Sequence, residues 1–189
     1  MSTQERTGET LEAVDAQKKA HIVIRNDAGD LIGALNDGAT VLVEGSAGKY
    51  AADGMTAGEV VIEGDADEGA GTAIYGGILV VKGDARNHVG QLLKGGTIIV
   101  VGNVGDYAGS FMVAGTIIVG GDAGRELGGS MVSGAIFIKG DYETLGANSQ
   151  QTRLTKNDKK TLEDLFAKHK LGLSMDGFKK IVPQEKRSM

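Results

Sequence analysis

The chain contains no cysteine and no tryptophan, and it has a single proline, Pro183. Without cysteine it can form no disulfide and can supply no thiolate for a metal ion, an iron–sulfur cluster or nucleophilic catalysis. Aromatic residues make up only 4% of the chain, so a globular core built on large rings is not expected.

Long apolar runs and clustered basic residues are also missing. No segment approaches the roughly 20 apolar residues of a membrane-spanning helix, and the polar residues 1–19 lack the apolar centre of a signal peptide. The formal net charge is −5, and no Lys/Arg cluster alternates with aromatic residues, which argues against a nucleic-acid-binding surface. These features predict a soluble, mildly acidic, cytoplasmic protein.

Glycine, by contrast, is abundant, with 31 residues in a chain of 189. Six glycines recur every 19 residues: Gly45, Gly64, Gly83, Gly102, Gly121 and Gly140. The next position is Asp, Asn or Ser in every repeat: Asp27, Ser46, Asp65, Asp84, Asn103, Asp122 and Asp141. A fixed period of this length is typical of proteins in which each repeat stacks on the next.

Two apolar columns follow the same period. The first is Ile22, Val41, Val60, Leu79, Ile98, Ile117 and Ile136, and the second is Ile24, Val43, Ile62, Val81, Val100, Val119 and Ile138. Residues two apart point to the same face of a strand, and β-branched residues favour strands. The sequence therefore predicts an all-β fold, a single-stranded right-handed β-helix of about seven 19-residue coils over residues 20–150.

The segments outside the repeat are predicted to cover the ends of the coils, because open strand edges invite association with other chains. Residues 1–19 are expected to form an N-terminal cap or tail, with Leu11 and Val14 as its apolar anchors. Residues 151–189 are expected to form a C-terminal helix and tail.

Within the C-terminal segment, residues 155–171 have the pattern of a helix, with a capping box formed by Thr155 and Asp158. An extended segment, residues 178–183, is predicted to follow. The basic residues near it are expected to be solvated or to face a partner: Lys179, Lys180, Lys186 and Arg187.

A third apolar column lies between the two inward columns and should point outward, because side chains alternate along a strand. It consists of Val23, Leu42, Val61, Val80, Ile99, Ile118 and Phe137. Two interpretations remain open. The chain's own C-terminal helix could cover this stripe, or the stripe could be a docking face for another subunit.

No residue is predicted to be catalytic, to bind a cofactor on this chain or to hold a metal. The Asp column is expected to accept backbone hydrogen bonds in turns rather than to bind calcium, because calcium-binding rolls use a nine-residue repeat. The glycines do not form a phosphate-binding motif. The three histidines, His21, His88 and His169, are not spaced as ligands or as a catalytic set.

The repeated units Gly58 to Ala66, Gly77 to Ala85 and Gly115 to Ala123 resemble those of GXGXG domains. That family includes the C-terminal domain of the large glutamate synthase subunit, stand-alone glutamate synthase-type subunits and the related subunit of N-methylglutamate synthase. It also includes one subunit of formylmethanofuran dehydrogenase and the equivalent subunit of a bacterial formyltransferase/hydrolase complex.

The short chain and the ending Phe178 to Pro183 resemble stand-alone glutamate synthase-type subunits, with N-methylglutamate synthase as the preferred branch. This resemblance implies a non-catalytic structural subunit of a hetero-oligomer. Its partners would be a glutaminase-like amidotransferase subunit and an FMN-binding synthase subunit, and the FMN and an iron–sulfur cluster would belong to partner chains. The alternative is the GXGXG subunit of a formylmethanofuran dehydrogenase or formyltransferase/hydrolase complex.

Overall fold

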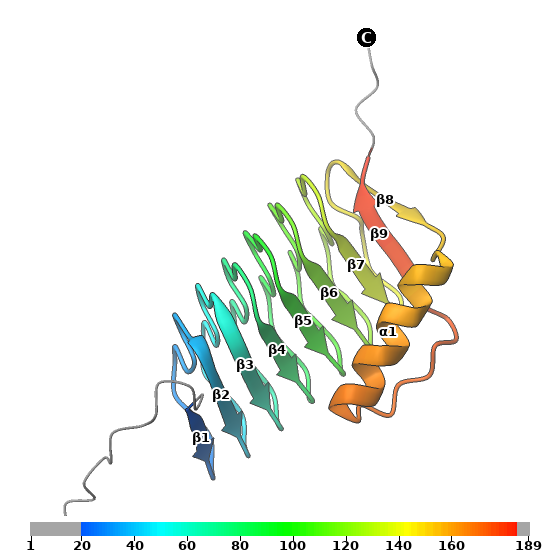
Figure 1. Cartoon of the computed structure of the whole chain (residues 1–189). Coiled ribbons are helices and arrows are strands. Elements are labelled where there is room, and N and C mark those ends of the chain that lie inside the picture. The colour runs from blue at the N-terminus through cyan, green and yellow to red at the C-terminus, as the bar shows by residue number, and fades with distance from the viewer. Residues whose placement is uncertain (1–19, 185–189) are drawn as a thin grey trace, which may run out of the picture.

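The computed structural model describes residues 20–184, which form nine strands of one sheet and one helix (Figure 1). The strands are β1 (His21–Ile24), β2 (Asp37–Val43), β3 (Ala57–Ile62), β4 (Ile78–Val81), β5 (Thr97–Val100), β6 (Thr116–Val119), β7 (Ala135–Ile138), β8 (Ser149–Thr152) and β9 (Lys179–Pro183), and the helix is α1 (Lys156–His169). The predicted N-terminal cap or tail, residues 1–19, lies outside the described residues.

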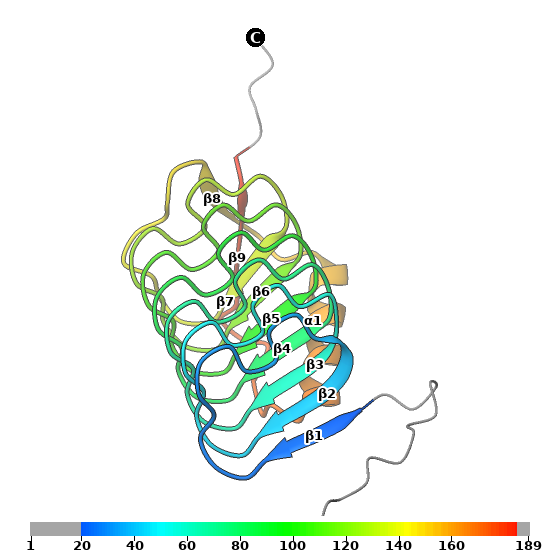
Figure 2. The same ribbon diagram turned by 90° about the vertical axis from the view of Figure 1, so that its left-hand side faces the viewer.

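Strands β1 to β7 are parallel, and each residue of the central register pairs with the residue 19 positions later, as in Leu79–Ile98 and Ile98–Ile117. A view turned by 90° shows the successive coils lying almost over one another (Figure 2). The prediction of an all-β, β-helical fold is confirmed. The chain makes about six turns between β1 and β7, slightly fewer than the predicted seven.

The interior of the coils is filled by the predicted inward columns. From β4 to β7 every inward strand residue is fully buried. A further inward column on the opposite side of each coil is also fully buried, and it includes Leu93, Met112 and Met131. Glycine is required where the bend meets this core. A Cβ on Gly109, whose φ is +70°, would lie 2.5 Å from Cδ1 of Ile136.

The Asp column forms a ladder of hydrogen bonds along the outside of the turns. In each step a side-chain oxygen accepts the backbone N–H of the equivalent residue in the next coil; Asp65 accepts from Asp84, and Asp84 accepts from Asn103. The predicted turn-capping role is therefore confirmed. A second ladder, which was not predicted from the sequence, runs three residues further on and includes Asn87 and Asp106.

The C-terminal segment closes one end of the rod. The predicted boundary at 150–151 falls within β8, and β9 lies antiparallel between β7 and β8. Ile181 of β9 pairs with Ile136 of β7 and is fully buried in the core of the coils. The last coil therefore does not end in an open strand edge.

Helix α1 begins at the capping box that the sequence predicted. The N–H of Asp158 donates to Oγ1 of Thr155 at 3.1 Å, and the N–H of Thr155 donates to the Asp158 carboxylate at 2.7 Å. Lys170 ends the helix in the left-handed conformation. The observed helix therefore begins one residue after the start of the predicted range, 155–171, and ends two residues before its end.

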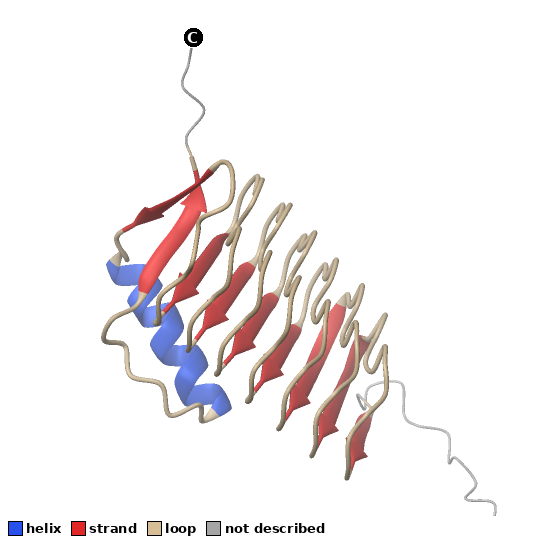
Figure 3. Ribbon diagram, turned by 180° about the vertical axis from the view of Figure 1, so that it is seen from behind, coloured by secondary structure: helices blue, strands red, loops and turns tan. Residues whose placement is uncertain are grey.

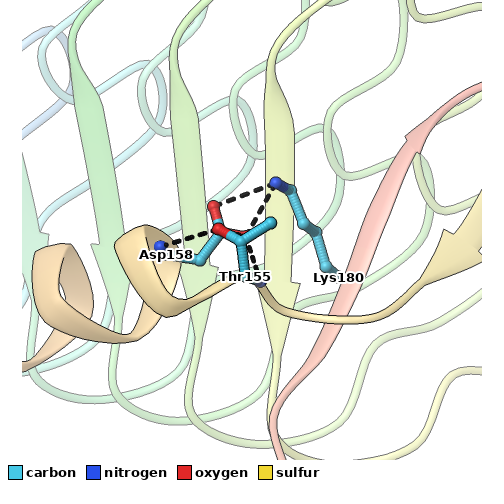
Figure 4. A network of polar contacts seen from close by, with 3 residues as sticks. All are labelled: Thr155, Asp158 and Lys180. Carbon is cyan, nitrogen blue, oxygen red and sulfur yellow. Dashed lines mark hydrogen bonds and ion pairs between the residues drawn. The ribbon is translucent and has the colours of Figure 1, made fainter.

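Lys179 and Lys180 were expected to be solvated or to face a partner, and the structure instead places both in contacts within the chain. Nζ of Lys180 donates to both carboxylate oxygens of Asp158 at 2.9 Å, and both side chains are largely buried (Figure 4). Lys179 donates to the Gly140 carbonyl at 2.8 Å and pairs with Asp141. The two lysines therefore fasten β9 to the helix start and to the last coil, while Lys186 and Arg187 lie outside the described residues.

The Asp158–Lys180 pair leads to a prediction about pH. Burial would raise the pKa of Asp158, but hydrogen bonds from Thr155 and Lys180 outweigh burial and hold that pKa below 3.8. The stabilisation is thus complete above pH 3.8 and is lost as pH falls through the lower, folded-state pKa. Asp158→Asn should lower the free energy of unfolding at pH 7 by about 1–3 kcal/mol.

Denaturant titrations of both proteins from pH 7 to pH 2 would test this prediction. The difference in the free energy of unfolding between wild type and Asp158→Asn should shrink as pH falls through the lowered, folded-state pKa of Asp158. Asp164→Asn, at an exposed carboxylate on the same helix, should change stability by no more than about 0.5 kcal/mol. A gap that stays constant down to pH 2 would show that the charge of Asp158 contributes nothing.

Candidate functional site

Helix α1 divides the outward apolar stripe into a covered and an uncovered part. Figure 3 shows the helix lying across the outer face of the strands. Four of the seven predicted interface residues are buried in one cluster with the helix: Val80, Ile99, Ile118 and Phe137. The helix contributes Leu162 and Phe166 to this cluster. A partner could reach these four strand residues only by displacing α1, so for them the interpretation as a covered face holds.

The other three residues of the stripe are not fully buried. Val61 is half-buried and packs against the cluster under α1, Leu42 is half-buried, and Val23 is 42% exposed. Contact of these three residues with a partner stays a prediction.

A contact between His169 and Glu59 holds the C-terminal end of α1 at the border between the two parts. Nδ1 of His169 lies 3.2 Å from Oε1 of Glu59 on β3, and only 6% of the His169 side chain is exposed. Burial lowers the pKa of His169, although the Glu59 carboxylate opposes this effect. His169, one of the three histidines considered in the sequence, therefore has a structural role, because its contact with Glu59 holds the end of α1 against β3.

A second apolar surface, which was not predicted from the sequence, lies on the bend that precedes each strand. We call it the bend patch; its members are between 44% and 68% exposed, and they are Leu92, Phe111, Val113 and Val132. Leu92 and Phe111 both have φ of 58°, a left-handed conformation that costs an ordinary L-residue about 1–2 kcal/mol. Exposed apolar side chains that lie on neighbouring coils are typical of an interaction surface.

The periodicity contained a signal for this patch. Phe111 and Val113 flank the inward residue Met112, and Leu92 and Val132 occupy the equivalent positions in the neighbouring coils. Alternation about an inward column would have assigned these residues to the surface. Their backbone conformation could not have been anticipated, because Leu and Phe are rare in the left-handed region.

Comparison with known families decides the classification. The GXGXG motif family matches residues 10–184, which is most of the chain. The chain belongs to the GXGXG family. A comparison with curated proteins finds no match.

Among solved structures, this GXGXG chain is similar to a chain of the formyltransferase/hydrolase complex FhcABCD from Methylorubrum extorquens, crystallised in complex with methylofuran. The two are 28% identical and superpose with a TM-score of 0.60. The match covers 82% of this chain and 68% of that chain.

The polar groups of the GXGXG coils are largely committed to structural contacts. Each ladder side chain uses one oxygen to accept a backbone N–H from the next coil, and the ring of His88 stacks on Tyr107 with centroids 5.1 Å apart. Among residues 20–184, no group of three or more His, Cys, Asp or Glu side chains is placed to hold a metal ion. No helix in the described part of the chain is long and apolar enough to cross a membrane.

The ladder side of the rod carries a groove of about 520 Å³. Its walls include the carboxylates of Asp106, Asp122 and Asp141, and Tyr142 also lines it. The bend patch and this acidic side are separate stretches of each coil, so the rod presents surfaces of different chemistry.

Proposed function

We propose that this chain is a non-catalytic structural subunit that holds other subunits of an enzyme complex together, and that the bend patch is one of its docking surfaces. The observation that carries the proposal is the exposure of Leu92, Phe111, Val113 and Val132 on coils whose inward apolar residues are fully buried from β4 to β7. A stable interface needs such a desolvated apolar centre, and an aromatic anchor such as Phe111 is typical of one.

The rigidity of the fold also supports a role in assembly. Parallel pairing in constant register and the Asp ladder hold each coil to the next, and the second ladder adds hydrogen bonds between some of the coils. The ladder side chains accept backbone hydrogen bonds, His88 stacks on Tyr107, and His169 contacts Glu59. Surfaces on such a rod keep a fixed separation, which suits a subunit that positions the active sites of other chains.

The preferred complex is of the glutamate synthase type, with N-methylglutamate synthase as the favoured branch. The chain would bridge a glutaminase-like subunit and an FMN-dependent synthase subunit, so that a nitrogen species released at one site could be used at the other. FMN and an iron–sulfur cluster would lie on partner chains; cysteine ligands for a cluster must come from there, because this chain has none.

The second candidate is a subunit of a formyltransferase/hydrolase complex. The similarity to a chain of FhcABCD, at 28% identity over 82% of this chain, favours it. Both candidates assign the same scaffold role to the coils and differ in the partner chains.

Affinity purification of the tagged chain from its native cells, with partner identification and an absorbance spectrum, would separate the candidates. A yellow complex with a glutaminase-like chain would support the first, and a complex with hydrolase and formyltransferase chains would support the second. Recovery of the chain alone at physiological salt would contradict the scaffold role.

The same experiment with Phe111→Asp tests the docking surface. Asp tolerates the left-handed backbone at this position, so the coils should remain folded. Loss of a buried aromatic anchor should weaken partner binding by about 30-fold, which corresponds to about 2 kcal/mol. Leu35→Asp is the matched control, because Leu35 is exposed with φ of 56° at the equivalent position of the first coil. Equal partner recovery with both variants would exclude the bend patch as an interface.

A further inference from the structure

The two ends of helix α1 are held to the sheet by groups that titrate in different pH ranges. At its start, Asp158 pairs with Lys180, and the pKa of Asp158 lies below 3.8 (Figure 4). Asp158 therefore keeps its charge over the range of about pH 5 to 8 in which a histidine titrates. At its end, the helix contacts β3 through His169 and Glu59. A change of pH near neutrality therefore acts on one end of the helix and not on the other.

The imidazole of His169 has a partner at one nitrogen and none at the other. Its Nδ1 lies 3.2 Å from Oε1 of Glu59, and only 6% of the side chain is exposed. Its Nε2 is buried and has no hydrogen-bond partner among the described residues. A neutral ring fits these surroundings when Nδ1 carries the proton and donates it to Glu59, because an unprotonated Nε2 needs no acceptor. A second proton creates an N–H donor at Nε2 that nothing accepts, and an unsatisfied buried donor is costly.

The charged groups that face the ring do not offset this cost. Burial lowers the pKa of His169 below 6.5, Lys168 on the same helix lowers it further, and the Glu59 carboxylate on β3 opposes both without cancelling them. A hollow of about 300 Å³ adjoins the contact. The neighbouring strands β2 and β4 contribute Thr40 and Ile78 to its wall, and neither side chain titrates. The docked end of the helix therefore disfavours a doubly protonated ring.

We propose that His169 is a protonation-sensitive latch, whose contact with Glu59 holds the last turn of α1, residues 166–169, on β3. With a neutral imidazole the helix is docked along its whole length. When the ring gains a second proton, the last turn lifts from β3, while the Asp158–Lys180 pair keeps the start of the helix in place. Docking of the last turn is thus strongest above pH 6.5 and weakens as pH falls from 6.5 toward the lower pKa of the docked ring.

The latch also controls the exposure of the outward apolar stripe. Val61 lies two residues after Glu59 on β3 and packs, partly buried, against the cluster under α1. Leu42 and Val23 continue the stripe on β2 and β1. Lifting the last turn uncovers Val61, so the length of stripe that solvent reaches depends on the protonation of one residue.

Amide hydrogen exchange at about pH 7.5 and about pH 5.5 tests the latch. Protection factors correct the measured rates for the pH dependence of intrinsic exchange. Those of Phe166, Ala167 and Lys168 should fall about tenfold at the lower pH, because the undocked last turn frays. Those of Ile98 and Val100 should not change, because the inward packing of the coils does not involve His169. The titration of the His169 ring, followed by NMR in the same protein, should have its midpoint below pH 6.5.

Two histidine variants assign the effect to one ring. His169→Gln does not titrate and keeps an N–H donor for Glu59, so its protection factors should be the same at both pH values. His88→Gln removes a histidine that stacks on Tyr107 and should reproduce the wild-type fall. Constant protection in the wild type, an equal fall in His169→Gln, or a fall that extends to Ile98 would overturn the proposal. A ring midpoint at or above pH 6.5 would also overturn it, and that measurement needs no variant.

Discussion

Replacing Ile99 by Asp is expected to release α1 from the sheet and to leave the stacked coils folded. Ile99 is fully buried in the cluster between β5 and the helix, where a carboxylate would have no partner. An unpaired buried charge costs about 3–5 kcal/mol, which undocking of the helix avoids. The neighbouring inward residues Ile98 and Val100 point to the opposite face and keep their packing.

A released α1 should also unfold, because an isolated helix of 14 residues is marginal in water. We therefore expect loss of the helical circular dichroism signal and rapid trypsin cleavage after Lys159 and Lys168. Amide hydrogen exchange in β5 and β6 should remain slow. Val113→Asp, at an exposed position of the bend patch, is the control and should change neither signal. Cooperative loss of protection in β5 and β6 together with the helix would show that α1 is part of the unit that holds the coils.

Replacing Gly115 by Ala is expected to destabilise the coils themselves. Gly115 has φ of +95°, and a Cβ there would lie 2.9 Å from backbone atoms of Gly95 and Gly96 in the preceding coil. Neither the strained backbone nor the contact can be relieved by a side-chain movement, since both neighbours are main chain. We expect a loss of about 3 kcal/mol or more, since strain and overpacking act at the same position.

For a chain of this length, such a loss should lower the melting temperature by about 6–12 °C. Gly29→Ala is the matched control, because its Cβ would meet nothing within 4 Å and its φ is not positive. It should shift stability by no more than about 0.5 kcal/mol. Equal melting temperatures for the two variants would contradict this prediction, because they would show that neighbouring coils can move apart locally to accept the added Cβ.

The coils could be predicted from the sequence because each repeat places the same residues in the same surroundings. The inward direction of Ile98 and Val100 could be predicted because the six equivalent positions in each column are also apolar. The Gly–Asp turn indicates where each strand ends. The start of α1 could be predicted because a capping box is local: Thr155 and Asp158 are three residues apart.

What could not be predicted depends on contacts between distant parts of the chain. The sequence left open whether the C-terminal helix or another subunit covers Val80 and Ile118, and nothing near Lys180 indicates that it pairs with Asp158. The exposure of the bend patch could have been inferred from alternation about Met112. The left-handed conformation of Leu92 and Phe111 could not, because the coil imposes it against the preference of those residue types.

Because the register from β3 to β7 is constant, equivalent surface positions lie at regular intervals along the rod. Each coil advances the stack by one strand spacing, about 4.8 Å, and equivalent outward positions recur on every coil. Gain or loss of one whole 19-residue repeat would therefore change the distance between two bound subunits by about 4.8 Å, one strand spacing, without altering the cross-section of the coils. Two active sites attached to such a rod could be moved apart or together in evolution only in whole steps, and this would favour relatives that differ in length by complete repeats.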